Sequence, residues 1–298
     1  MVARALALVE EHLQKPAHDT FRLVAGTSTG AIIAACIAAG VSAQKIHELY
    51  RELGCTVFRK SVRRWLWWLG LPRYRHGPLE AALKEQLGDV TMGDLGTATP
   101  AIDVVITMFD LVKNRTRFVK PWKEEYSTWP VIKAVLASCS VPTYFPPVEG
   151  RYVDGGVGSY SNPCYLAAYE LALCLEWNPA ETTLISLGTG RDPRTFRPGD
   201  ADHLWVKKWL ERVLGAFLQS ADDQQVRLVR TFFEQLDFRR FQVDLDERIR
   251  MDDASAIADL DEYGRKLAEK ILRDETDPAQ SIDAGTAPDS FENALRAQ

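Results

Sequence analysis

Two hydrophobic patterns alternate along this chain. Short apolar runs that are typical of buried strands occur at residues 21–25, 102–108, 116–119, 151–153, 182–187 and 238–245. Segments typical of amphipathic or buried helices occur at residues 1–14, 31–39, 42–53, 78–87, 129–137, 162–173, 203–218 and 254–272. Because strands and helices alternate, we predict an α/β fold whose central sheet is covered by helices on both faces.

The chain is organised around residues 21–40, where a strand pattern runs into a helix pattern. Between the two lies Gly26-Thr27-Ser28-Thr29-Gly30, a Gly-x-Ser-x-Gly motif in the strand–turn–helix context of a nucleophile elbow. A sharp turn there lifts Ser28 clear of the sheet, and the missing Cβ of Gly26 and Gly30 lets strand and helix approach closely. Free N–H groups at the start of the helix favour developing negative charge. We therefore predict that Ser28 is a nucleophile.

Two other interpretations of this stretch remain open from the pattern alone. The first is a glycine-rich turn that only packs a strand against a helix. The second is a membrane span, because no charged residue lies between Arg22 and Lys45. The glycines, the Thr/Ser cluster and the alanine-rich helix argue against a span, since the truly apolar part is far shorter than the ~20 residues that crossing a bilayer requires.

A serine hydroxyl is a weak nucleophile and needs a base, for which the sequence offers two candidates. Asp154 ends a short strand pattern, and Gly155 and Gly156 let the backbone turn tightly beside it, so its carboxylate could take the Ser28 proton directly. An aspartate that only caps a turn is the alternative interpretation. His203 is the one histidine that follows both Ser28 and a plausible aspartate, in the chain order of α/β-hydrolases. It opens a helix after a loop, without a turn motif that would hold it.

Two further segments suggest contacts with lipid. Arg59–Arg75 is rich in arginine, contains no acidic residue and includes Trp65, Trp67 and Trp68, a combination that suits an anionic lipid surface. A helix whose tryptophans pack on the domain explains the same pattern. Residues 203–218 are amphipathic and predict a core helix, with a membrane element as the alternative.

Composition narrows the class of protein further. The 298 residues carry a formal net charge of −5, which gives no general attraction to nucleic acid, and we predict no nucleic-acid partner. The five cysteines are scattered without C-x-x-C spacing, so we predict reduced thiols in a cytoplasmic protein and no zinc site. The first residues do not form a signal peptide. Residues 274–298 turn to Asp, Pro, Ala and Ser, and predict a disordered tail.

Five stretches of the chain together resemble the patatin-like phospholipases. They are Gly26–Gly30 after its apolar strand, Ala137–Pro147, Asp154-Gly155-Gly156 followed by Asn162-Pro163, Ser186–Gly190, and Met251–Ala254 before the last helix. The motifs occur in the family's order, and the resemblance extends over roughly Met1 to Leu272. It implies a single domain over residues 1–273, folded as a three-layer sandwich with a mostly parallel central sheet.

The resemblance also implies a chemistry. Ser28 would be the nucleophile and Asp154 the base of a Ser–Asp dyad that hydrolyses fatty-acyl esters of lipids through an acyl-enzyme, without metal or cofactor. The same fold also performs acyl transfer between lipids. As competing functions we consider a non-catalytic lipid- or protein-binding pseudo-hydrolase and an esterase that uses Ser28, an aspartate and His203.

In one respect the chain departs from the family pattern. Family members begin with a strand and a glycine-rich loop just before the helix that matches Met1–Gln14, and this sequence begins after that loop. The loop supplies N–H groups to the oxyanion hole, so that only the Thr29 backbone N–H remains as an expected donor here. The strand is expected in the middle of the sheet, beside the strand that leads to Ser28. Either the start lies further upstream, which we favour, or the protein is a shortened member.

Overall fold

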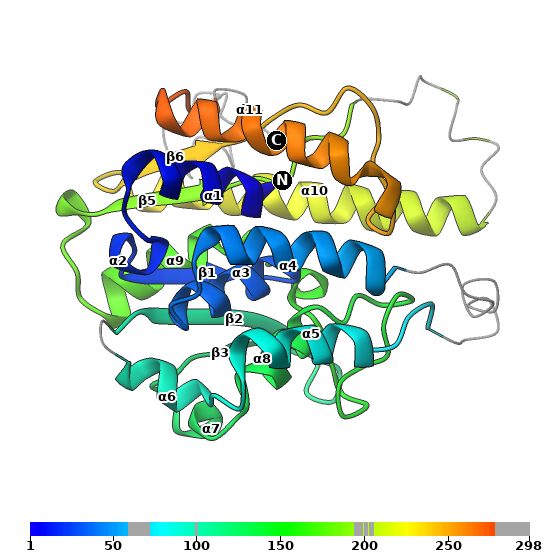
Figure 1. Ribbon diagram of the computed structural model, residues 1–298, viewed down its shortest axis with the longest axis horizontal. Helices are drawn as coiled ribbons and strands as arrows, with labels where there is room; N and C mark the ends of the chain where they lie inside the picture. The colour runs from blue at the N-terminus through cyan, green and yellow to red at the C-terminus, as the bar shows by residue number, and fades with distance from the viewer. Residues whose placement is uncertain (59–71, 99–100, 194–198, 200–201, 203–205, 278–298) are drawn as a thin grey trace, which may run out of the picture.

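The computed structural model describes residues 1–58, 72–98, 101–193, 199, 202 and 206–277 (Figure 1). The strands are β1 (Leu23–Gly26), β2 (Asp103–Asp110), β3 (Arg115–Val119), β4 (Tyr152–Asp154), β5 (Thr183–Leu187) and β6 (Asp237–Phe241). The helices are α1 (Val2–Leu13), α2 (Ala17–Thr20), α3 (Thr29–Ala38), α4 (Ala43–Thr56), α5 (Gly77–Leu87), α6 (Met92–Thr97), α7 (Glu124–Ser127), α8 (Val131–Ser138), α9 (Cys164–Tyr169), α10 (Val206–Phe232) and α11 (Ile257–Leu272). The predicted α/β class is confirmed.

The strands form a central layer between two layers of helices. β1 and β2 are parallel, as are β5 and β6, whereas β3 and β4 run antiparallel to β2, so the sheet is mixed. Side chains alternate along β1: Leu23 packs with α9 and α10, and Val24 packs with the core under α3, α4 and α8. The three-layer sandwich predicted from the sequence is therefore present. Among the described residues, β1 pairs only with β2, and β5 only with β6.

Strand β2 brings the ends of two other strands together. β1 pairs with the first half of β2 and places Gly26 opposite Ile106, and β4 pairs with the second half and places Asp154 opposite Met108. Both must lie on the same edge of β2, because β3 occupies the other edge across residues 106–110. Since β1 is parallel and β4 antiparallel to β2, their C-terminal ends point toward each other. Their partners on β2, Ile106 and Met108, are two residues apart, so the two ends lie roughly 7 Å apart along that strand.

An ion pair fixes β4 in this position. The Arg151 guanidinium donates from Nε and Nη2 to the two Asp110 carboxylate oxygens at 2.8 and 2.6 Å. Asp110 is fully buried and also accepts from the backbone N–H groups of Val112 and Lys113. The hydrogen bonds from Arg151, and to a lesser extent those from the two backbone N–H groups, hold the pKa of Asp110 well below its usual range. The bidentate geometry sets the register of β4, and with it the place of Asp154.

Helix α10 differs in its two halves. Its C-terminal half buries Ala221, Val226 and Val229. The two valines pack against α9 and against the segment just before β6. In its N-terminal half, Trp209 and Phe217 are 44% and 40% exposed. The prediction of a core helix over residues 203–218 is therefore wrong for this exposed face. The helix also continues to Phe232, beyond the predicted end.

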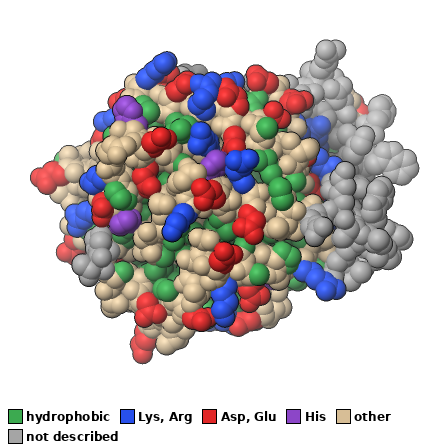
Figure 2. Space-filling model, in the orientation of Figure 1, with side chains coloured by type: hydrophobic (Ala, Val, Ile, Leu, Met, Phe, Trp, Pro, Cys, Tyr) green, Lys and Arg blue, Asp and Glu red, His purple; other side chains and the backbone are tan. Residues whose placement is uncertain are grey.

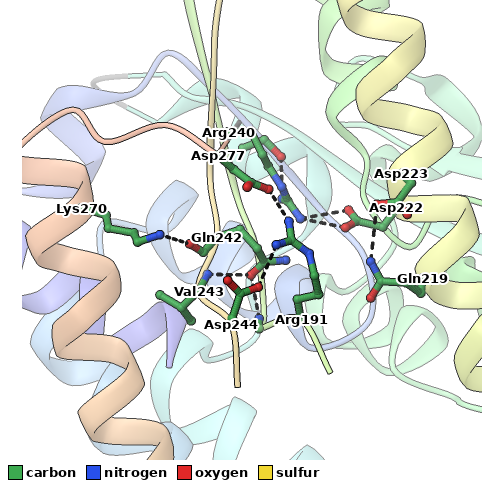
Figure 3. A network of polar contacts seen from close by, with 12 residues as sticks. Arg191, Gln219, Asp222, Asp223, Arg240, Gln242, Val243, Asp244, Lys270 and Asp277 are labelled. Carbon is green, nitrogen blue, oxygen red and sulfur yellow. Dashed lines mark hydrogen bonds and ion pairs between the residues drawn. The ribbon is translucent and has the colours of Figure 1, made fainter. Parts of the chain in front are cut away.

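A buried polar network ties α10 to β5 and β6 (Figure 3). The Arg240 guanidinium donates to both carboxylate oxygens of Asp222 on α10, at 3.0 and 2.8 Å, and to the Ser186 hydroxyl on β5 at 2.9 Å. Beside it, Arg191 forms ion pairs with Asp244 and Asp277. Asp277 is buried, so packed structure extends four residues into the tail predicted from residue 274, and residues 278–298 lie outside the described residues.

The basic, tryptophan-rich segment is described only at its end. Arg59–Leu71, which includes Trp65, Trp67 and Trp68, lies outside the described residues. Arg73 and Tyr74 are buried, with the Arg73 guanidinium 4.4 Å from the Tyr144 ring centroid and the Tyr74 hydroxyl donating to Asp252 at 2.9 Å. The inclusion of Arg73 in a lipid-facing surface is therefore wrong. No helix in the part of the chain that is described has the length and apolar character needed to cross a bilayer.

The two glycines of the elbow have different roles. A Cβ at Gly26 would overlap the Gly30 carbonyl and lie 2.7 Å from Ala31 Cα, so β1 and α3 meet at this position. A Cβ at Gly30 would meet nothing within 4 Å. The prediction that both glycines allow the close approach is therefore correct for Gly26 and wrong for Gly30.

We expect Gly26→Ala to lower the free energy of unfolding by about 3 kcal/mol, because the new methyl group has no room beside the α3 backbone. Gly30→Ala should change it by less than about 1 kcal/mol, and upward, because alanine is the better helix former. Urea unfolding of the two variants and the parent measures both values. Equal stability of the two variants would contradict the contact at Gly26.

Candidate active site

Ser28 lies on a strained turn between β1 and α3. Its backbone has φ 56° and ψ −131°, a positive-φ conformation that costs a residue other than glycine of order 1–3 kcal/mol. The side chain is half-buried, and it makes no capping hydrogen bond to α3, which leaves the hydroxyl free for another partner. This is the strand–turn–helix geometry that the motif predicted.

The end of α8 holds this turn in place. The Ser28 backbone N–H donates to the Ser138 hydroxyl at 2.9 Å, and the Cys139 thiol donates to the Ser28 carbonyl at 3.0 Å. Burial raises the pKa of the Cys139 thiol well above its usual value, so the thiol remains a neutral donor. Two neighbouring side chains of one motif therefore bind both peptide groups of Ser28, and this support offsets the strain.

The same segment also holds Asp154. The Asp154 backbone N–H donates to the Ser140 carbonyl at 3.1 Å, next to Ser138 and Cys139. Asp154 is 4% exposed, and its Oδ1 accepts from the Gly156 backbone N–H at 2.7 Å. Oδ2 is buried and has no hydrogen-bond partner in the described residues. A buried, unpaired carboxylate oxygen is costly, so its presence points to a role other than stability.

Burial raises the pKa of Asp154 to about 6, while its interactions with the Ser28 side chain and the Gly156 N–H lower it. The Ser28 hydroxyl therefore lies beside the Asp154 carboxyl group. The hydrogen bond itself is incomplete, because no bond of ordinary distance and angle reaches Oδ2. The structure brings Ser28 and Asp154 together from positions 126 residues apart in the chain.

Thr107 is a site residue that sequence analysis missed. It is fully buried on β2, between the partners of Gly26 and Asp154, and its hydroxyl is 2.7 Å from that of Thr27. A Cβ at Gly155 would lie 2.8 Å from Thr107 Cβ, so Gly155 is required at this contact. One signal could have identified Thr107: it is the single hydroxyl in the apolar run Ile102–Met108.

A backbone N–H at the start of α3 is available beside Ser28. Gly30 N–H donates to the Thr27 carbonyl and Ala31 N–H to the Ser28 carbonyl. Among the described residues, the Thr29 N–H has no acceptor, and Thr29 itself is exposed. The N-terminus of a helix favours an anion through both its unpaired N–H groups and its dipole.

Of the four histidines in the described part of the chain, none contacts Ser28. His47 is buried and pairs through Nε2 with Asp261 at 2.8 Å. His76 lies 2.9 Å from the Ser140 hydroxyl, which already donates to Leu136. The Ser140 oxygen must therefore accept the hydrogen bond from His76, which carries its proton on Nε2. This hydrogen bond supports the residues that follow α8. His203 lies outside the described residues.

Two other features lie away from this site. Within the described residues, no group of three or more His, Cys, Asp or Glu side chains is arranged to hold a metal ion. A hollow of about 430 Å³ lies between α1, α4 and α11, lined by His47, Asp261 and several charged side chains. It includes neither Ser28 nor Asp154, so we do not assign the chemistry to it.

These contacts define what the arrangement can do chemically. A hydroxyl on a sharp turn, a carboxyl group with a raised pKa and a free oxygen, and an unpaired N–H are the parts of a nucleophile, a base and an anion site. They converge at the C-terminal ends of β1 and β4, which β2 aligns.

Comparison with known proteins gives consistent results. A family model described as patatin-like phospholipase matches residues 2–168. Relatives include an intracellular phospholipase A2 of Caenorhabditis elegans, 29% identical over 209 residues, which are 65% of this chain and 19% of that protein. A cGAMP-activated phospholipase of Pseudomonas aeruginosa is 27% identical over 219 residues, 70% of this chain and 63% of that protein. One of the same name from Vibrio cholerae is 26% identical over 289 residues, 84% of this chain and 79% of that protein.

The chain thus spans less than two thirds of the length of the first two of these relatives. The family model nevertheless covers more than half of the chain and includes both Ser28 and Asp154. On this match, together with the α/β sandwich, the chain belongs to the patatin-like phospholipase family.

Proposed function

We propose that this protein is a lipid acyl hydrolase in which Ser28 is the nucleophile and Asp154 the base. The observation that carries the proposal is the Asp154 carboxyl group, buried beside the Ser28 hydroxyl with one oxygen unpaired and its pKa raised to about 6. The relatives are named phospholipases, which supports a lipid ester as the substrate.

In the proposed reaction, ionised Asp154 takes the proton of the Ser28 hydroxyl as Ser28 Oγ attacks the carbonyl carbon of a fatty-acyl ester. The proton then passes to the oxygen of the departing alcohol, and the acyl group stays on Ser28 as an ester. Asp154 then takes a proton from a water molecule as its oxygen attacks the acyl carbon, and gives that proton to Ser28 Oγ as the acyl–Oγ bond breaks, which releases the fatty acid and restores the serine. A pKa of about 6 suits this role, because Asp154 is mostly ionised at pH 7 yet is a stronger base than an ordinary aspartate.

The Thr29 N–H is the proposed donor to the negative oxygen of the tetrahedral intermediate. It is unpaired among the described residues and adjoins Ser28 at the start of α3. A second donor is expected from the glycine-rich loop that the family places before Met1–Gln14, and loss of one donor typically costs about 10²–10³ in rate. That expectation remains a prediction, as does membrane contact through Trp65, Trp67 and Trp68.

Two competing functions remain distinct from this proposal. A pseudo-hydrolase that binds lipid or protein has no reactive serine, although a strained elbow and an unpaired buried carboxylate would then bring no benefit. An esterase that depends on His203 requires the His203 side chain, and not that of Asp154, to contact the Ser28 hydroxyl. Labelling and substitution separate the three.

The first prediction concerns the two proposed catalytic side chains. Ser28→Ala should abolish labelling by a fluorophosphonate probe, and Asp154→Asn should lower kcat/KM for a short-chain p-nitrophenyl ester by about 10³ or more. His203→Ala is the matched control and should keep activity within about twofold. An inactive His203→Ala with a tolerated Asp154→Asn would instead favour the histidine-dependent esterase, and an unlabelled parent protein would favour the pseudo-hydrolase.

A second prediction concerns pH. Because the base must be ionised, kcat/KM should be constant above pH 7 and fall about tenfold per unit below a midpoint near the Asp154 pKa of about 6. A pH–rate profile between pH 4.5 and 8.5 measures the midpoint. A midpoint near the ordinary aspartate value, close to pH 4, would contradict the role of burial.

Stability provides a third prediction that needs no substrate. The pKa of Asp154 is higher in the folded protein than in the unfolded chain. The contribution of this residue to folding stability is therefore fully present below pH 3.8 and is lost as pH rises through about 6. At pH 8 the buried charge therefore opposes folding. We expect Asp154→Asn to raise the free energy of unfolding by about 1–3 kcal/mol at pH 8 and much less at pH 4, measured by urea unfolding. An equal effect at both pH values would argue against a buried charge.

A further inference from the structure

Two side chains from other helices hold the backbone around the Thr29 N–H, the proposed donor to the tetrahedral intermediate. Cys139, at the end of α8, donates from its thiol to the Ser28 carbonyl at 3.0 Å. Tyr50, on α4, donates from its hydroxyl to the Thr29 carbonyl. These two carbonyls belong to the peptide groups on either side of the Thr29 Cα atom. The two side chains therefore limit both backbone rotations at this residue.

We propose that Cys139 and Tyr50 are positioning residues that aim the Thr29 N–H at the negative oxygen of the tetrahedral intermediate, an inference that rests on the proposed function. The Ser28 carbonyl and the Thr29 N–H belong to one peptide group, and in a planar trans peptide they point in opposite directions. The carbonyl accepts from the Cys139 thiol and from the Ala31 N–H, the latter at 2.9 Å. The Thr29 N–H must therefore point away from both donors, and a rotation of this peptide would break both hydrogen bonds.

Both side chains remain neutral donors. Burial raises the pKa of the Cys139 thiol well above its usual value, and the Asp154 carboxylate raises it further. Burial also raises the pKa of the Tyr50 hydroxyl well above its usual value, and the next contribution comes from Cys139, so the two donors lie near each other. A hydrogen bond to a peptide carbonyl polarises the peptide group and strengthens its N–H as a donor, by about 10–30% per bond. The thiol thus both orients the Thr29 N–H and strengthens it.

Tyr50 reaches the elbow from the inner side of α4. It follows Ile46 by four residues and precedes Leu53 by three, and both of these are buried, so the three share one side of the helix. The outer side includes Glu48 and Arg51, which are exposed. Figure 2 shows charged side chains of both signs over the face formed by α1, α4 and α11. A phenylalanine would fill the same inner space, so the hydrogen bond to the elbow is what the tyrosine adds.

Two residues of the same types serve as matched controls. Cys36, on α3, is fully buried, and burial alone raises the pKa of its thiol to about 12, as expected of a thiol without a hydrogen-bond partner. Tyr263, on α11, is buried, and its hydroxyl donates to Asp246 at 2.9 Å. It packs with residues of α1 and β6, away from the elbow. Removing the Cys36 sulfur or the Tyr263 hydroxyl therefore repeats the loss of packing or of a hydrogen bond without touching Thr29.

The test replaces the reacting carbonyl oxygen by sulfur. A developing negative sulfur accepts weaker hydrogen bonds than a negative oxygen, so a well-aimed donor favours p-nitrophenyl butyrate over its thiono analogue. We expect Cys139→Ala and Tyr50→Phe each to lower kcat/KM for the oxygen ester by about tenfold, less than the roughly 10²–10³ that loss of a donor costs. The ratio of kcat/KM between the oxygen and the thiono ester should fall at least about threefold. KM should stay within about twofold, because the donor acts in the transition state.

The other variants decide whether the hydrogen bond or the packing matters. Cys139→Ser keeps a donor and should stay within about threefold of the parent in both quantities, and Cys36→Ala and Tyr263→Phe within about twofold. An unchanged ratio in Cys139→Ala and Tyr50→Phe would overturn the proposal. So would a Cys139→Ser as impaired as Cys139→Ala, because the sulfur would then act by packing alone. If Cys139→Ala does not fold, Cys139→Val, which fills the space without a donor, replaces it.

A measurement without substrate separates this inference from the proposed function. A hydrogen bond to a peptide carbonyl moves the ¹⁵N resonance of the following amide downfield. In protein labelled with ¹⁵N-threonine, the Thr29 resonance, assigned through its loss in Thr29→Ser, should move upfield in Cys139→Ala and keep its position in Cys36→Ala. An unmoved resonance in Cys139→Ala would overturn the positioning role of the thiol. A moved resonance in a protein that cleaves no ester would reject only the proposed function.

Discussion

The candidate site depends on β2, because both β1 and β4 pair with the same edge of this strand. Because β1 and β4 meet this edge from opposite directions, the turn that carries Ser28 and the turn that carries Asp154 end face to face. Their relative position follows from backbone hydrogen bonds to β2, from Thr107 between them, and from the α8 segment Ser138–Ser140, which binds both.

Two aspartates near β2 show how the surroundings set their chemistry. Asp110 accepts a bidentate pair from Arg151, and its pKa is lowered, so it serves only to fix β4. No positively charged group contributes to the pKa of Asp154, and burial raises that pKa. The groups that lower this pKa, the Ser28 hydroxyl and the Gly156 backbone N–H, are both neutral. The same side chain is thus a structural anchor in one place and a candidate base in another.

Local patterns in the sequence predicted the local parts of this arrangement. The elbow at Ser28, the turn after Asp154 and most helices and strands follow from runs of a few residues, and their order gave the α/β class. Contacts that depend on tertiary packing were not predictable. Thr107 looked like one residue of a buried strand. Arg73 was placed in a lipid-facing segment and is buried against Tyr144, and Gly30 was expected at a close approach and faces open space. The face of α10 with Trp209 has the pattern of a core helix, because periodicity shows which side is apolar and not what covers it.

The distances in sequence across the site also have a consequence for folding. The hydrogen bonds that hold the elbow join residues 80, 110 and 111 positions apart, so they form only after β1, β2 and α8 have come together. A partly folded chain would carry Ser28 on a relaxed turn, without a neighbouring carboxylate to take its proton. We therefore expect the reactivity proposed for this serine to appear only as the whole sandwich closes. Under the proposed function, such coupling would keep a newly made chain from cleaving lipid esters until its folding is complete.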